Sequence, residues 1–365
     1  MSPVGVGIIG AGVISATYLE NLTSFAGVEV RRIADLDVDR AAERAAEFGV
    51  AASGTVDELL ADDSVDIVVN LTIPAVHAEV ATRIVDAGKH VWGEKPLALD
   101  VASGRALLDH AGSLGRRVAS APDTLLGAGL QTAARTIASG AIGTPLAATA
   151  VFQVPGPDAW HPNPDFLFAR GAGPLFDMGP YYLSALVTNL GPVAEVTAAG
   201  GAARRERVIG SGPRAGETFP VEVPTTVQAL LRFRSGASAQ LTLSFDTHRA
   251  RAGVLEIIGS AGTLVLPDPN GFDGASTLFD ADNPEGREIP AEGHTASRGT
   301  GVAELAEAIA EGRPERASGA LALHVLEVME SIESAIASGE TVHIVSTVEV
   351  APPLAADWDP ARVLA

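Results

Sequence analysis

A lysine in the segment Gly88–Pro96 stands where a proton could be exchanged with a ligand. The segment is typical of a short strand that ends in a turn carrying Lys95. Pro96 fixes its own φ and favours an extended conformation for the preceding residue. The carboxyl end of a strand in an open α/β sheet is where ligands bind, and burial can shift an ammonium toward a neutral amine that exchanges protons with a hydroxyl. The alternative is a surface lysine in a tight turn.

A glycine-rich turn near the start of the chain has the pattern of a dinucleotide site. An apolar run typical of a buried strand is followed by GAGVIS at residues 10–15, which is G-x-G-x-x-G with serine in the third place. Gly10 would make the tight turn, and Gly12 would let the backbone approach a pyrophosphate. Helical spacing follows, so the free N–H groups of Val13 and Ile14 would bind the diphosphate. The alternative is a plain glycine turn.

Asp35 stands at the spacing expected of the acid that binds the adenosine ribose. It ends a second apolar strand, a little over 20 residues beyond Gly12. Its carboxylate would accept hydrogen bonds from the ribose hydroxyls and repel a 2′-phosphate, and the next residue, Leu36, cannot hold that phosphate. NAD is therefore favoured over NADP. The alternative is a helix cap, although Asp37 could also supply that cap.

Alternating strands and helices continue as far as Pro122. Short connections in this pattern predict a doubly wound parallel sheet, so residues 1–122 are expected to form a dinucleotide-binding Rossmann domain. A third loop at the same sheet edge contains Thr72 and Pro74 and leads to His77. His77 either lies near the nicotinamide end of the cofactor or binds a nearby carbonyl from the first turn of a helix.

The pattern changes after Pro122, and residues 123–365 are expected to form a domain for substrate binding and oligomerisation. Short strand runs beyond residue 193 predict a mainly antiparallel sheet. A long loop rich in proline, glycine and aromatic residues is often functional. Asp177 and Tyr181 are four residues apart beside a helix whose first residue would be Pro180. Their face either lines a polar pocket or is solvated, with Asp177 as its cap.

Composition excludes several classes of protein. The formal net charge of −20 and the pI of about 4.7 disfavour nucleic acid and anionic membranes as partners. The chain has no cysteine, so disulfides, thiolate zinc sites and cysteine nucleophiles are excluded. Histidines and carboxylates show no metal-ligand spacing, and neither a membrane span nor a signal peptide is found. We expect a cytoplasmic protein without a metal.

With the glycine turn, Lys95 and Asp177 identified, the chain resembles the Gfo/Idh/MocA oxidoreductase family over nearly its whole length. The motif Glu94-Lys95-Pro96 stands in the family's order with residues 72–77, 140–143 and 173–182. The resemblance implies a Rossmann domain joined to an open-sheet α/β domain. It also implies NAD(P)-dependent hydride transfer to or from a secondary alcohol of a sugar, a cyclitol or a derivative.

The resemblance also implies a set of site residues. The expected cofactor-binding residues are Gly10, Gly12, Val13, Ile14, Asp35, Thr72, Pro74, His77, Glu94 and Lys95. The expected catalytic residues are Lys95, Asp177 and Tyr181, which also bind substrate, and the composition of the long loop adds Trp160 and His161 as a wall facing the sugar. Many members of the family carry histidine where this chain has Tyr181, so the acid/base is either Tyr181 or Lys95.

Two other functions are compatible with the same residues. One is an NAD-dependent glycosidase that uses transient oxidation to drive elimination, and the other is a non-catalytic NAD-binding sensor. Retention of Lys95 and Asp177 favours an enzyme. Because an open sheet has one face that needs cover, we expect a homodimer or homotetramer formed through that face.

Overall fold

The structure is a computed structural model, and it describes residues 3–362. The chain folds into two compact units, each assembled from separate stretches. Unit 1 comprises the described parts of Met1–Gln131, Glu292–Leu326 and Val350–Ala365, and unit 2 comprises Thr132–Ala291 and Glu327–Glu349. The predicted domains were the continuous ranges 1–122 and 123–365. The chain instead returns to unit 1 twice, because residues 292–326 and the described residues from 350 onward pack with the first unit.

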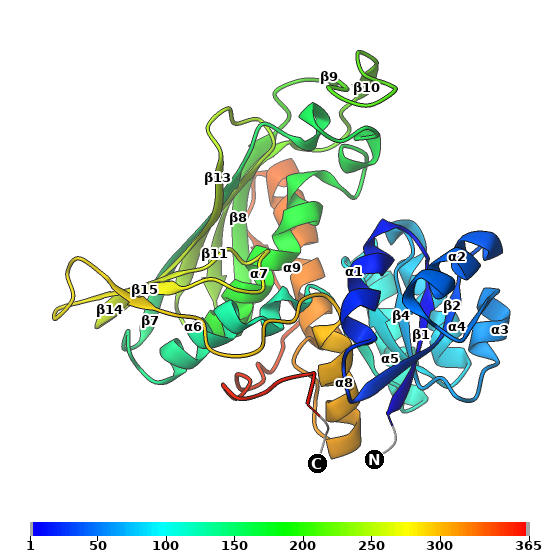
Figure 1. The fold of residues 1–365 in the computed structure, drawn as a ribbon. Coiled ribbons are helices and arrows are strands. Elements are labelled where there is room, and N and C mark those ends of the chain that lie inside the picture. The colour runs from blue at the N-terminus through cyan, green and yellow to red at the C-terminus, as the bar shows by residue number, and fades with distance from the viewer. Residues whose placement is uncertain (1–2, 363–365) are drawn as a thin grey trace. The chain divides into compact units, whose positions relative to one another are not determined.

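Unit 1 is built on a six-stranded parallel sheet, which confirms the predicted doubly wound architecture (Figure 1). The strand order β3-β2-β1-β4-β5-β6 is that of a dinucleotide-binding fold. The strands are β1 (Val4–Ile9), β2 (Val28–Ala34), β3 (Ala52–Gly54), β4 (Ile67–Asn70), β5 (His90–Gly93) and β6 (Val118–Ser120). Their carboxyl ends share one edge, so the loops after β1, β4 and β5 are neighbours there.

Side-chain caps mark the start of several helices of unit 1. Asp37 caps α2 by accepting a hydrogen bond from the N–H of Arg40, and Thr55 forms a capping box with Glu58 at the start of α3. Asp35 is therefore not the cap of α2. The helices after the successive strands are α1 (Val13–Leu22), α2 (Val38–Phe48), α3 (Val56–Leu60), α4 (His77–Asp86) and α5 (Val101–Ser113).

Helix α8 (Thr300–Glu311) packs against the sheet of unit 1 although it comes roughly 180 residues after β6. Val302 and Leu305 share a buried cluster with Tyr18 and Trp92. A Cβ placed on Gly301 would lie 1.9 Å from the Trp92 ring, so only glycine permits this approach of helix to indole. The cover of this sheet face therefore depends on a segment far away in the sequence.

Unit 2 is built on a nine-stranded, mainly antiparallel sheet, as the sequence predicted. Its order is β16-β15-β14-β13-β7-β12-β11-β8-β17, and β12 and β7 run parallel. The strands are β7 (Pro145–Gln153), β8 (Val193–Gly201), β11 (Thr226–Phe233), β12 (Ser238–Ser244), β13 (Arg251–Gly259), β14 (Gly262–Leu266), β15 (Ser276–Asp280), β16 (Arg287–Ile289) and β17 (Val342–His343). A separate ribbon is formed by β9 (Glu206–Val208) and β10 (Thr218–Pro220).

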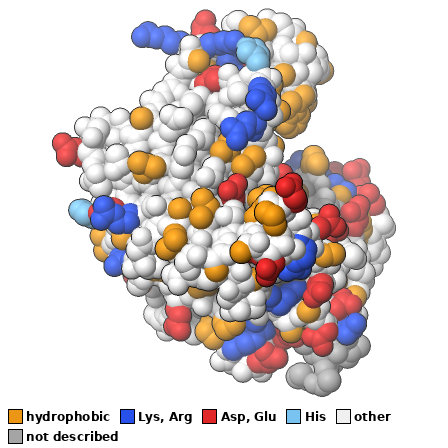
Figure 2. Space-filling view, turned by 90° about the vertical axis from the view of Figure 1, so that its left-hand side faces the viewer, with side chains coloured by type: hydrophobic (Ala, Val, Ile, Leu, Met, Phe, Trp, Pro, Cys, Tyr) orange, Lys and Arg blue, Asp and Glu red, His pale blue; other side chains and the backbone are white. Residues whose placement is uncertain are grey.

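One face of this sheet is covered by α7 (Gly173–Leu190), and the other is open. Alternate residues of β11 are exposed, among them Gln228 and Leu230. Figure 2 looks toward the open face and shows a broad area with few charged side chains and scattered apolar ones. The division between the units falls within α6 (Ala128–Ala138) and α9 (Gly319–Ser338).

The predicted start of α7 at Pro180 is wrong. The helix begins at Gly173, Pro174 occupies its first turn, and Pro180 lies inside it. Pro180 has no N–H, so one intrahelical hydrogen bond is missing there. Burial on most sides stabilises α7 despite this loss, because 15 of its 18 residues are buried. Asp177 consequently lies within the helix and does not cap it.

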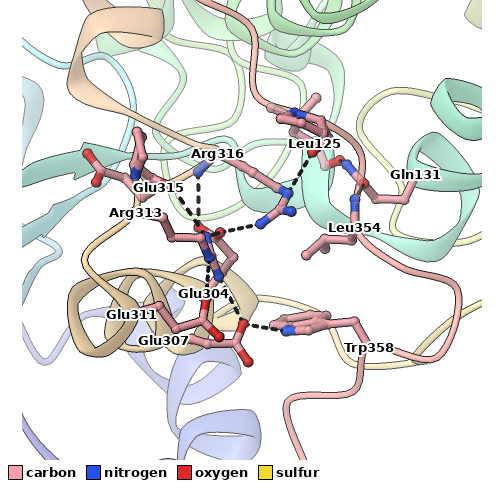
Figure 3. Close-up of polar contacts among 12 residues, drawn as sticks. Leu125, Gln131, Glu304, Glu307, Glu311, Arg313, Glu315, Arg316, Leu354 and Trp358 are labelled. Carbon is pink, nitrogen blue, oxygen red and sulfur yellow. Dashed lines mark hydrogen bonds and ion pairs between the residues drawn. The ribbon is translucent and has the colours of Figure 1, made fainter. Parts of the chain in front are cut away.

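A network of charged residues holds the C-terminal segments of unit 1 (Figure 3). The buried carboxylate of Glu304 on α8 accepts hydrogen bonds from Arg313 at 2.5 Å and from Arg316 at 2.7 Å. Glu307, one turn further, accepts the indole N–H of Trp358 at 2.7 Å. These bonds connect α8 to the connection that precedes α9 and to the C-terminal tail, so the two returning stretches support each other.

Candidate active site

The glycine turn of unit 1 has the geometry that a diphosphate needs. Gly10 has a φ of +106°, and a Cβ there would lie 2.7 Å from the carbonyl oxygen of Leu71. Gly12 occupies the N-cap of α1 without a side-chain cap, and a Cβ on Gly12 would meet no described atom within 4 Å. Val13 is 93% exposed, so the first turn of α1 faces open space. A helix N-terminus of this kind fits a phosphate.

The carboxylate of Asp35 is held at the end of β2. Its Oδ2 accepts the N–H of Ala11 at 2.7 Å, while Oδ1 accepts the N–H of Asp37 at 2.9 Å and a hydrogen bond from Arg40 at 2.8 Å. Burial alone would raise the pKa of Asp35, but these hydrogen bonds outweigh it and lower the pKa below its ordinary value. Asp35 is therefore an ionised acceptor beside the glycine turn.

His77 connects the loop after β4 to the turn that carries Lys95. The imidazole is buried, with Nδ1 2.7 Å from the carbonyl oxygen of Pro96 and Nε2 3.0 Å from that of Thr72. This is the second of the two roles expected for His77, namely contact with nearby carbonyls. A contact between His77 and the cofactor stays a prediction, as do those of Thr72 and Pro74, which lie in the same loop.

Asn70 at the end of β4 was not recognised in the sequence. Its buried side-chain oxygen accepts the Thr72 hydroxyl at 2.6 Å, and its amide donates to the carbonyl of His77 at 3.1 Å. The signal was present, because a polar residue directly follows an apolar strand at the ligand-binding edge. Asn70 shapes the loop that contains the expected cofactor residues.

Lys95 follows β5, is half-buried and lies in a turn fixed by Glu94. Oε2 of Glu94 accepts the backbone N–H of Lys95 at 3.0 Å, and Oε1 accepts the hydroxyl of Tyr18. Burial, together with the carboxylates of Glu94 and Asp123, raises the pKa of Tyr18 well above its ordinary value, so this phenol remains a donor. Glu94 therefore positions the lysine, a role that sequence reasoning did not assign to it.

The four site residues expected in the second domain meet at one pocket of unit 2. Trp160, His161, Asp177 and Tyr181 all line a cavity of about 670 Å³. Asp177 and Tyr181 are one turn apart on α7 and therefore project from the same side of the helix. Apart from Asn270, the remaining lining is apolar, with contributions from the long loop 154–167 and from Phe152 and Phe245 at the ends of β7 and β12. The predicted polar face of α7 thus lines a pocket.

A row of three aromatic rings lies on the loop side of this pocket. The Trp160 and His161 rings are 5.6 Å apart and steeply inclined, and the His161 and Phe166 rings are 5.5 Å apart in the same manner. Nδ1 of His161 accepts the N–H of Asn163 at 3.0 Å, which orients the imidazole. We name Trp160, His161 and Phe166 the aromatic row.

Arg207 holds the wall of the pocket and was not recognised in the sequence. The buried guanidinium donates to Asp158 at 2.6 Å and to Asp246 at 2.5 Å, and also to the carbonyls of Pro155 and Phe245. It stacks 4.9 Å from the centre of the Phe168 ring. No local pattern identifies such a residue, because its partners come from three separate segments, at residues 155–158, 168 and 245–246.

The described residues contain no group of three or more histidine, aspartate or glutamate side chains arranged to hold a metal ion. Within residues 3–362, no helix combines the length and apolarity needed to span a bilayer. Unit 1 thus contains a glycine turn, Asp35 and Lys95 at the edge of its sheet. Unit 2 contains a pocket with a carboxylate, a phenol and aromatic rings.

Known protein families match segments in both units of the chain. Residues 4–121 match the Gfo/Idh/MocA model described as an oxidoreductase family with an NAD-binding Rossmann fold, and residues 130–265 match that family's C-terminal domain. An uncharacterised oxidoreductase of Rhizobium meliloti is 32% identical over 272 residues, which cover 74% of this chain and 76% of the relative. The 1,5-anhydro-D-fructose reductase of Ensifer adhaerens is 30% identical over 267 residues, with coverages of 71% and 74%.

A solved structure agrees with the fold throughout. The NAD-binding oxidoreductase of Klebsiella pneumoniae superposes with a TM-score of 0.83 at 24% identity, covering 94% of this chain and all of that one. The chain belongs to the Gfo/Idh/MocA family of oxidoreductases. It is an NAD-dependent enzyme, and its glycine turn and Asp35 fit that cofactor.

Proposed function

We propose that the enzyme transfers hydride between NAD and a secondary alcohol of a sugar, a cyclitol or a derivative. The observation that carries the proposal is the pocket of unit 2, where the Asp177 carboxylate and the Tyr181 phenol stand one helical turn apart beside aromatic rings. Polar groups of these kinds bind hydroxyls, and aromatic faces bind the apolar face of a sugar ring. The relative from Ensifer adhaerens is named for a sugar derivative.

In the direction of oxidation, the bound NAD supplies the hydride acceptor. Asp177 orients a substrate hydroxyl or Lys95, and either Tyr181 or Lys95 accepts the hydroxyl proton. A phenol is a weak base at neutral pH, so Tyr181 acts in this role only with a cation to stabilise its anion, and we assign that part to the Lys95 ammonium. Trp160 and His161 form the wall that faces the sugar.

The proposed cofactor-binding residues are the ten expected from the sequence, of which Gly10 is the first and Lys95 the last. Diphosphate binding is assigned to the N–H groups of Val13 and Ile14, and ribose binding to Asp35. We propose NAD rather than NADP because Asp35 is ionised and Leu36 cannot pair with a phosphate. The nearby Arg40 is engaged with the Asp35 carboxylate.

The test is the absorbance of reduced nicotinamide when the purified protein is mixed with NAD and a panel of sugars, inositols and sugar acids. A rise with one stereochemical subset supports the dehydrogenase. If NAD binds but no compound gives a rise, the proposal fails. Substrate turnover without net NADH would then favour the redox-elimination glycosidase, and no turnover with any ligand would favour the sensor.

We also propose that two or four copies assemble through the open face of the unit 2 sheet. That face is poor in charged side chains, and Leu146 and Leu230 are more than half exposed on β7 and β11. Light scattering at working concentration tests this, and a monomer would rule it out. A cytoplasmic location, where NAD and sugars are both present, completes the proposal.

A further inference from the structure

We propose that the pocket of unit 2 binds a neutral sugar that carries an apolar substituent, such as the aglycone of an aryl glycoside. The sugar would lie in the buried part of the pocket with the Trp160–His161 wall facing it, and the substituent would extend from the sugar over the exposed outer part of the aromatic row. The inference rests on the proposed function, because it specifies the substrate class of the same pocket. Burial, charge and size each support it.

Burial divides the pocket into a buried side on α7 and an exposed side on the loop. Tyr181 and Met178 on α7 are each 6% exposed, so the helix side of the pocket is deep within unit 2. On the loop side, Trp160 is 68% exposed and Phe166 is 60% exposed. The Tyr181 side chain and the exposed rings are thus at different depths, and a ligand that contacts both has a polar ring for the phenol and an apolar extension for the exposed rings.

A cluster of exposed aromatic rings often marks a binding site, whereas single exposed apolar residues are common on protein surfaces. The Trp160 and Phe166 rings both lie within 5.6 Å of the His161 ring, so they form one continuous surface. Rigid aromatic side chains of this kind provide large contact area at low cost in conformational entropy. An apolar substituent would cover this surface and remove it from water.

Charge argues against a phosphate or carboxylate on the ligand. Among the described residues of unit 2 that line the pocket, none is lysine or arginine, and Asp177 contributes a carboxylate. Arg207, which binds the loop wall from behind, is 2% exposed in its side chain and paired with Asp158 and Asp246. An anionic substituent would therefore lose its hydration without gaining a cation from unit 2.

Size and rigidity are consistent with an extended ligand. A cavity of about 670 Å³ lies in the range that holds drug-sized ligands, which is more than a single sugar ring fills. Arg207 binds the carbonyl of Pro155 and the carboxylate of Asp158, so the loop wall is fixed from behind. The pocket is therefore largely formed before a ligand arrives.

The test is isothermal titration of the full chain, saturated with NAD, with methyl and phenyl β-glycosides of glucose, galactose and mannose and with the corresponding 6-phosphates. We expect at least one phenyl glycoside to bind about tenfold more tightly than its methyl counterpart, which corresponds to about 1.4 kcal/mol, and the 6-phosphates to bind more weakly than the free sugars. Equal affinities for phenyl and methyl glycosides, tighter binding of a 6-phosphate, or no binding of any glycoside would overturn the inference.

Variants of the aromatic row test whether these rings cause the preference for phenyl over methyl glycosides. Trp160→Ala and Phe166→Ala should each reduce the preference for the phenyl glycoside to about threefold or less. Val345→Ala, at an apolar residue of unit 2 that is 78% exposed and does not line the pocket, should leave it unchanged. An unchanged preference in both row variants would also overturn the inference. Because these rings are exposed, the variants should fold, which circular dichroism checks.

A separate NADH measurement distinguishes this inference from the proposed function. Phenyl glycosides that bind preferentially but yield no NADH leave the inference intact and count against the dehydrogenase. NADH formed from free sugars without any preference for phenyl glycosides leaves the dehydrogenase intact and overturns the inference.

Discussion

The hydroxyl of Tyr18 donates a 2.8 Å hydrogen bond to Oε1 of Glu94, which joins α1 to the end of β5. The same hydroxyl accepts the indole N–H of Trp92 at 3.2 Å, and the second oxygen of Glu94 accepts the backbone N–H of Lys95. Glu94 is therefore part of a chain of hydrogen bonds that fixes the position of the Lys95 backbone.

Tyr18→Phe should lower the free energy of unfolding by about 1–3 kcal/mol, because a buried carboxylate oxygen and an indole N–H both lose their partner. Urea denaturation measures the change. The ring remains, so no cavity contributes to the loss. Unchanged stability would show that water replaces the phenol and that the hydrogen-bond chain is dispensable.

Asp123 should make stability depend on pH. Burial raises its pKa to about 6, opposed by Arg298 and reinforced by Glu94. An unfolded aspartate titrates near 3.9, so the folded state binds the proton more tightly. The contribution to stability is fully present below about pH 4 and is lost as the pH rises through about 6.

Asp123→Asn should remove this dependence. We expect the free energy of unfolding of the wild type, relative to the variant, to fall by about 2 kcal/mol between pH 4 and pH 7. Urea denaturation at several pH values gives the difference directly. A difference that stays constant with pH would contradict the assignment, whatever the absolute stability of the variant.

Asp35→Ala should weaken NAD binding by about 10–100-fold, because hydrogen bonds to a charged group contribute roughly 1.5–3 kcal/mol. The relative affinity for NADP should rise, since a negative charge is removed and Arg40 loses its partner. Titration with both cofactors measures the two effects. Asp37→Ala is the matched control, because it removes the cap of α2 and should leave the cofactor preference unchanged.

Lys95→Ala should reduce turnover by roughly 10²–10⁴-fold while NAD binding changes little, as expected of a residue that moves a proton. Steady-state kinetics and cofactor titration separate these effects, and an equal loss of both would contradict the proposed role.

Tyr181→Phe then decides between the two candidate bases. A loss of turnover comparable to that of Lys95→Ala assigns proton transfer to the phenol, and retained turnover assigns it to the lysine. Tyr182→Phe is the control, because its hydroxyl accepts the N–H of Gly253 and does not line the pocket.

Arg207→Ala should destabilise the protein by about 3–5 kcal/mol, because it leaves the Asp158 and Asp246 carboxylates without their buried partner. Arg214→Ala removes an arginine that is also paired with two acids but lies partly exposed, and it should cost less than about 1 kcal/mol. Urea denaturation of both variants gives the comparison. Equal losses would mean that the buried arrangement contributes nothing beyond a surface ion pair.

Features with local partners were predictable from the sequence, and features with distant partners were not. The capping box of Thr55 and Glu58 spans three residues, and the glycine turn needs only its own strand and helix. In contrast, Arg207 acts through residues 38 to 52 positions away, and its partners have no common pattern. The extent of α7 was missed because Pro180 was taken as its start, whereas tertiary burial overrides the missing hydrogen bond.

The pocket was partly predictable for the same reason. Asp177 and Tyr181 share a helix face by spacing alone, and Trp160 and His161 stood out in an aromatic loop. Phe152 and Phe245 could not be assigned to it, because strand order decides that the ends of β7 and β12 are neighbours.

The packing of Gly301 on Trp92 has a consequence for synthesis on the ribosome. At roughly 5–20 residues per second, α8 is completed roughly 10–40 s after β6. During that interval the indole and its apolar neighbours lack the cover that α8 provides, so the nascent Rossmann sheet exposes an apolar surface that chaperones or neighbouring chains can bind.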